Sequence, residues 1–91
     1  MGETATRKIR RATALSEMSI LEEEGQHGYH LVDFGVLRLE LEPSDHPWQH
    51  LRLVLPSPDA LAALQEAGWR VVGSWTVFTY LKRPTSKTHP G

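Results

Sequence analysis

The chain has 91 residues, a formal net charge of −1 and no cysteine. This length allows one domain with a modest core, for which we expect a net stability of about 5–10 kcal/mol. The lack of cysteine excludes disulfides, zinc–thiolate sites and thiol nucleophiles. No apolar run reaches the ~18 residues of a membrane span and no signal-peptide pattern is present, so we expect a cytoplasmic protein without a membrane partner.

The N-terminal residues 1–12 are polar and basic, and they predict either a mobile arm or a first edge strand. A single α+β domain is expected over residues 13–84. Its first helix begins at Thr13 or Ser16, and it ends at Gly25. The acidic run of residues 22–24 faces water in this interpretation, and a basic group from the arm would offset its unfavourable position near the helix C-terminus.

Alternating apolar residues predict the next strands. Residues 29–34 form a strand that ends in a turn or bulge at Gly35, and residues 36–42 form another. After a proline-bounded loop, residues 48–55 alternate again. The residues expected to face the core are Leu37, Leu39, Leu41, Leu51, Leu53 and Leu55.

The second half begins with a helix whose ends are marked locally. Ser57-Pro58-Asp59 is a helix start and Gly68 a helix stop, with Leu61, Leu64 and Ala67 on one stripe between them. Two apolar strands follow, with a hairpin turn expected at Gly73-Ser74. Residues 85–91 are expected to be a disordered tail.

The two halves resemble each other, because each reads as a helix, a glycine–aromatic pair and a hairpin. Gly28-Tyr29 and Gly68-Trp69 are 40 positions apart, with a three-residue insert expected after Gly25 in the first half. An ancient duplication and two merely similar units both remain open. The assembled prediction is an antiparallel sheet of four or five strands with two helices on one face. A ferredoxin-like fold, with residues 5–12 as an edge strand, is the alternative.

The segments LQEAGWRVV and FTYLKRP, and more loosely EEEGQHGYHLV, resemble small bacterial domains of unknown function with a helix–Gly-Trp–hairpin pattern. The resemblance covers most of residues 15–84. It implies a fold and no reaction, and it transfers no catalytic residues.

The histidines do not predict a metal site or an enzyme. His46 and His50 are four apart, but Pro47 breaks any helix between them. No nucleophile elbow, P-loop, HExxH or dinucleotide fingerprint is present, so no cofactor is expected and an enzyme is the weaker hypothesis. The basic arm makes nucleic-acid binding a lesser alternative, since the aromatic signature of an RNA-binding sheet is absent.

The leading functional prediction is a non-enzymatic binding or regulatory module that forms protein contacts, with a homodimer as the simplest case. Trp48 lies opposite the leucines of its strand, so it is expected on an exposed sheet face. The residues of that predicted surface are Trp48, His50, Arg52, Arg38 and Trp75. The alternative is a ferredoxin-like dimer that binds or converts a small molecule in a pocket between helices and sheet, lined by Tyr29, His30 and Trp69.

Overall fold

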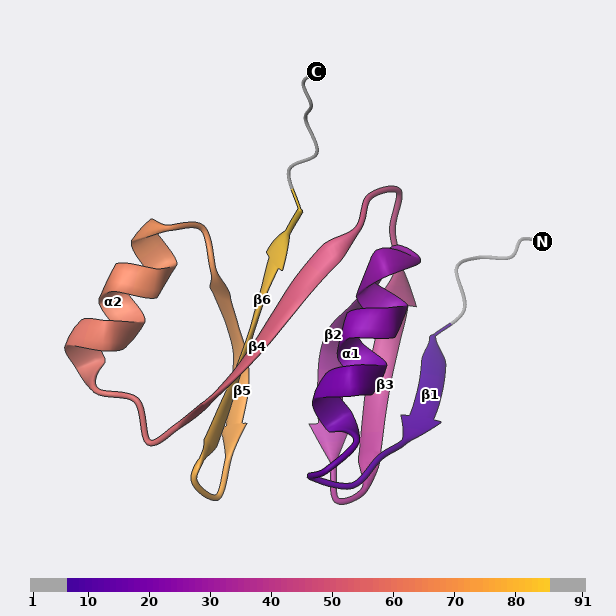
Figure 1. The fold of residues 1–91 in the computed structure, drawn as a ribbon, viewed down its shortest axis with the longest axis horizontal. Helices are drawn as coiled ribbons and strands as arrows, with labels where there is room; N and C mark the ends of the chain where they lie inside the picture. Colours follow the sequence, from indigo (N-terminus) through magenta and orange to yellow (C-terminus); the bar gives the residue numbers. More distant parts are fainter. Residues whose placement is uncertain (1–6, 86–91) are drawn as a thin grey trace.

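The computed structural model describes residues 7–85, which form two helices and six strands (Figure 1). In chain order they are β1 (Lys8–Arg11), α1 (Glu17–Gln26), β2 (Tyr29–Gly35), β3 (Arg38–Pro43), β4 (Trp48–Val54), α2 (Pro58–Glu66), β5 (Arg70–Trp75) and β6 (Phe78–Pro84). The expected α+β class with antiparallel strands is confirmed. The predictions for residues 1–6 of the N-terminal arm and for residues 86–91 of the tail lie outside the described residues.

The strands form two sheets of three, ordered β1-β3-β2 and β4-β6-β5. The predicted single sheet of four or five strands is therefore wrong, and the order of elements also differs from the ferredoxin-like alternative. Ile9 pairs with Glu40, so β1 occupies one edge of β3 while β2 occupies the other. The first sheet ends at β1 and β2, and β4 pairs with β6 in a second sheet.

The two sheets repeat one β-α-β-β plan in the same register. Leu31 pairs with Leu41 in the first sheet, and Val71 pairs with Leu81 in the second, 40 positions later. Both pairings are followed by a register shift, at Val32 and at Val72. The structure thus bears out the resemblance of the two halves as a repeated topology.

The helices lie on opposite sides of the second sheet. α1 lies over the first sheet and also against β4. α2 lies on the other side of the second sheet, away from α1 (Figure 1). The main core therefore forms around α1, and its buried residues are Ala12, Leu21, Leu31, Leu39, Leu41 and Tyr80. Leu39 and Leu41 face inward as predicted. Leu37 and Leu55 do not, because Leu37 lies just before β3 and Leu55 just after β4, each with a positive φ, and they are 55% and 72% exposed.

One of the buried side chains of α1 is a glutamate, at a position where an apolar residue would be expected. Glu24 is 3% exposed, and its carboxylate accepts hydrogen bonds from Lys8, over 2.9 Å, and from Arg10, both on β1. Burial by itself would raise the pKa of Glu24, but the two cations hold it below its ordinary value. The expectation that residues 22–24 all face water is wrong at Glu24, and the basic partner comes from the N-terminal segment, as expected.

The predicted second helix is confirmed and the predicted second turn is wrong. Ser57 Oγ accepts from the Ala60 N–H over 3.1 Å, and Gly68 follows the helix with a φ of 98°. The β5–β6 turn lies at Thr76 and Val77, not at Gly73-Ser74. Gly73 stays within β5, where a Cβ atom would lie 3.2 Å from Phe34 Cζ, so the glycine allows β5 to pack on β2.

Candidate functional site

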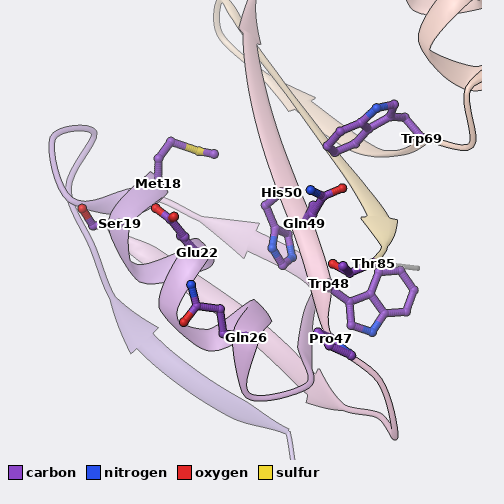
Figure 2. A pocket seen from close by; sticks show the side chains of 10 residues that line it. All are labelled: Met18, Ser19, Glu22, Gln26, Pro47, Trp48, Gln49, His50, Trp69 and Thr85. Carbon is purple, nitrogen blue, oxygen red and sulfur yellow. The ribbon is translucent and has the colours of Figure 1, made fainter. Parts of the chain in front are cut away.

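A groove of about 560 Å³ lies between α1 and β4 (Figure 2). Figure 2 shows the α1 side chains on one side, the two tryptophans on the other and His50 between them. The lining residues are Met18, Ser19, Glu22 and Gln26 of α1, Pro47, Trp48, Gln49 and His50 at β4, and Trp69 and Thr85. Both repeats thus contribute to one concave surface.

Beside the groove, α1 approaches β4 closely at Gly25. This glycine is buried inside the helix and does not end it, contrary to the sequence prediction. A Cβ atom there would overlap the Trp48 carbonyl oxygen. The three-residue insert that we expected after a helix end at Gly25 is therefore absent from that place, because α1 continues to Gln26.

Trp48 is only 6% exposed, so its predicted exposure is wrong. The strand phase was correct, since Trp48 does lie opposite Leu51, but α1 and the first sheet cover that face instead of water. Its Nε1 donates to Ser44 Oγ over 2.7 Å. The His30 ring stacks on it with a centroid distance of 4.5 Å and an interplanar angle of 18°.

His50 is held neutral between the two sheets. Its Nε2 accepts from the Leu31 N–H over 3.1 Å, so the ring proton must sit on Nδ1. Burial, with smaller effects of Lys82 and His30, lowers the pKa of His50 to about 4, although the Leu21 carbonyl acts in the opposite direction. Nδ1 is buried without a partner of hydrogen-bonding geometry.

Lys82 and His30 bind each other behind Trp48. Lys82 Nζ donates to His30 Nδ1 over 2.7 Å and to the Leu31 carbonyl over 2.8 Å. Burial is the main cause that lowers the pKa of both side chains, and their mutual proximity adds to the shift of His30. His30, His50 and Lys82 therefore connect the two sheets.

Trp69 forms the aromatic end of the groove. The Arg83 guanidinium lies 4.5 Å from its ring centroid. Gln49 Oε1 accepts from Nε and Nη2 of Arg83, over 3.2 and 2.9 Å, which fixes the guanidinium. One face of the indole is thus occupied, and its remaining surface is what Trp69 offers to a ligand.

Glu22 carries the only full charge among the lining side chains, because His50 is neutral. None of the ion pairs within residues 7–85 involves its exposed carboxylate. Met18, Glu22 and Gln26 are spaced by four and so share one helix face. That spacing is visible in the sequence, but the opposing strand is not, and for this reason sequence reasoning missed them.

The other predicted site residues are dispersed. Arg38 pairs with Glu40 over 2.9 Å on the first sheet, and Arg52 pairs with Glu17 over 2.9 Å against α1. Trp75 is 46% exposed beside the β5–β6 turn. The predicted surface residues therefore do not share one face.

The predicted pocket residues are also only partly brought together. Trp69 lines the groove, but His30 lies behind Trp48. Tyr29 lies under Lys8, whose Nζ is 4.7 Å from its ring centroid.

Within residues 7–85, no group of three or more metal-ligating side chains is placed to hold an ion. No helix of this part of the chain is both long and apolar enough to cross a membrane. Comparison with known proteins gives no match to a family model, to a curated protein or to a solved structure.

Proposed function

We propose that the protein is a small non-enzymatic binding module whose groove holds an organic cation with a flat apolar body. The observation that carries this proposal is the combination, in one groove, of the free indole surface of Trp69 and the unneutralised carboxylate of Glu22. It replaces the sheet-face surface expected from the sequence, since Trp48 is buried.

The chemistry of the lining favours such a ligand. An indole face attracts cations and stacks on flat rings. Glu22 would add Coulomb attraction. None of the lining side chains is itself a cation, although Arg83 contacts Trp69 and Arg70 and Lys82 lie beside Trp48. The amides of Gln26 and Gln49 would offer hydrogen bonds at the rim, because Gln49 keeps its NH₂ group after its oxygen has bound Arg83.

The histidines and the lysine beside the groove are bound within the fold, and Glu22 is the ionisable side chain that a ligand can reach. His50 uses Nε2 to accept from Leu31, and His30 and Lys82 use each other. A general acid or base must reach the proton that it transfers, and these groups are already engaged within the fold.

The test compares tryptamine with indole-3-propionate, which share a ring and differ in charge, by isothermal titration calorimetry. Tryptamine should bind and indole-3-propionate should not. Glu22→Gln should weaken tryptamine about two- to fivefold, as expected for a partly exposed ion pair. Trp69→Ala should weaken it further.

The matched control is Glu23→Gln, because Glu23 is exposed on the same helix and does not line the groove. It should leave tryptamine binding unchanged. Equal effects of the two glutamine variants, or no tryptamine binding at millimolar concentration, would refute the proposal.

A further inference from the structure

One end of the molecule carries most of its exposed apolar side chains. Of the nine large apolar residues exposed within residues 7–85, all but Ile9 and Val71 lie at this end. Val36 and Leu37 form the β2–β3 turn, and Trp75 and Val77 flank Thr76 at the β5–β6 turn. Val54 ends β4 and Leu55 follows it, and Leu15 lies between β1 and α1. Figure 1 shows these connections together at its lower end.

These side chains form one surface across both sheets. A cleft of about 160 Å³ is lined by Val36 and Leu37 of the first sheet and by Trp75 and Phe78 of the second. The Leu55 N–H donates to the Val77 carbonyl over 2.8 Å, which ties the end of β4 to the neighbouring turn. We call this surface the apolar end.

Two leucines of the apolar end occupy strained backbone positions. Leu37 has a φ of 60° and Leu55 a φ of 46°, in the left-handed region that bulky residues avoid. Asparagine or glycine would fit there more easily. Both leucines are more than half exposed, so little burial within the chain offsets this cost. An apolar contact outside the chain would explain why leucine occupies both positions.

Charge at the rim indicates which contact this is. Arg11 and Arg38 pair across β1 and β3 directly beside Leu37, and like charges in such a pair repel each other. Arg38 also bridges to Glu40, while Arg11 takes part in no ion pair within residues 7–85. Glu17, which lines the cleft, is paired with Arg52, and the exposed carboxylates of Asp33 and Asp59 lie in β2 and in the first turn of α2. Anionic headgroups would neutralise these two arginines, Arg11 and Arg38, and Arg11 in particular has no carboxylate partner within residues 7–85.

We propose that the apolar end docks onto the surface of an anionic lipid bilayer. The turn side chains enter the interfacial region, with Trp75 at headgroup depth, and Arg11 and Arg38 contact lipid phosphates. This departs from the expectation, drawn from the lack of a membrane span, of no membrane partner. Docking at this end leaves the groove open, so the inference does not depend on the proposed ligand.

The test is co-sedimentation of the full chain with vesicles of phosphatidylcholine alone or mixed with phosphatidylglycerol. Binding should be stronger to the mixed vesicles, and brominated lipids should quench the fluorescence of Trp75 but not of a Trp75→Phe variant. Leu37→Asn with Leu55→Asn should lower vesicle affinity at least tenfold. Because asparagine tolerates positive φ, this double variant should keep or raise the melting temperature.

Two controls separate docking from general effects. Ile9→Thr removes an exposed apolar side chain elsewhere and should not alter vesicle binding. Arg11→Gln should weaken binding to the mixed vesicles about fivefold, whereas Arg7→Gln, at a residue paired with Glu40 and Glu42, should not.

The proposal would be overturned by an absence of binding to either vesicle, or by binding that survives the double asparagine substitution. A concentration-dependent dimer that the same double variant dissociates, without vesicle binding, would assign the apolar end to a second copy instead.

Discussion

The main-chain N–H of Leu31 on β2 donates to Nε2 of His50 on β4 over 3.1 Å, and this bond joins the two sheets. Leu31 is fully buried, so its N–H has no access to water in place of the imidazole. The bond also fixes the tautomer of His50 and leaves its protonated Nδ1 facing α1. One histidine thus connects the strand edge of the first repeat, its helix and the second sheet.

His50→Phe should destabilise the protein by about 1–3 kcal/mol. Phenylalanine fills a similar volume but leaves the buried Leu31 N–H without an acceptor. Urea unfolding followed by circular dichroism measures the loss. His27→Phe is the control, since His27 is exposed at the end of α1. A loss below about 0.5 kcal/mol would show that the inter-sheet bond contributes little.

Stability should fall as the pH decreases below about 6.5. The pKa of His50 is about 4 in the folded protein, against 6.5 for an ordinary histidine, so the unfolded chain takes up a proton first. The contribution is fully present above pH 6.5 and is lost toward pH 4, to a total of about 3 kcal/mol. The lowered pKa of His30 acts in the same direction.

The measurement is a set of urea unfolding curves between pH 7.5 and 5 for the wild type and for His50→Gln. Glutamine can accept from Leu31 but does not titrate, so the variant should lose much of the pH dependence. If the free energy of unfolding changed with pH to the same extent in both proteins, the assignment of a neutral, buried His50 would be contradicted.

Glu24→Leu should destabilise the protein, and adding Lys8→Leu and Arg10→Leu should restore it. The single change leaves two cations beside an apolar side chain, at a cost of about 1–3 kcal/mol because both can partly reach water. In the repeated register, Lys8 corresponds to Leu51, Arg10 to Leu53 and Glu24 to Leu64. The triple variant therefore copies a combination that the second repeat already uses.

Urea unfolding of the single and triple variants tests this equivalence. The triple variant should match or exceed the wild type, since apolar replacement of a buried ion pair is often neutral or stabilising. A triple variant less stable than Glu24→Leu alone would mean that the two repeats pack their helices differently.

Features fixed by neighbouring residues could be predicted from the sequence. The start of α2 depends on Ser57 and Pro58, and its end on Gly68, so local chemistry sufficed. The burial of Leu39 and Leu41 followed from alternation within one strand. The similarity of the two halves was also visible, because the same residue types recur at a constant spacing.

Features that depend on distant partners could not be predicted. Alternation placed Trp48 correctly on its strand, but it could not tell that α1 of the other repeat covers that face. Gly73 resembled a turn residue, although its role is to admit Phe34 of β2. The groove forms because α1 packs beside β4, and no local sequence pattern indicates that these two elements are neighbours.

Gly25→Ala should destabilise the protein although alanine favours helix by about 1 kcal/mol over glycine. The new methyl group would overlap the Trp48 carbonyl, which belongs to the backbone and cannot swing aside. Overpacking of this kind costs about 1–3 kcal/mol beyond the propensity gain. Glu23→Ala, at the exposed position two residues earlier, should be neutral or slightly stabilising. Thermal unfolding of both variants distinguishes the effects. Equal melting temperatures for Gly25→Ala and the wild type would show that α1 can move away from β4 freely, and the groove would then have no fixed width.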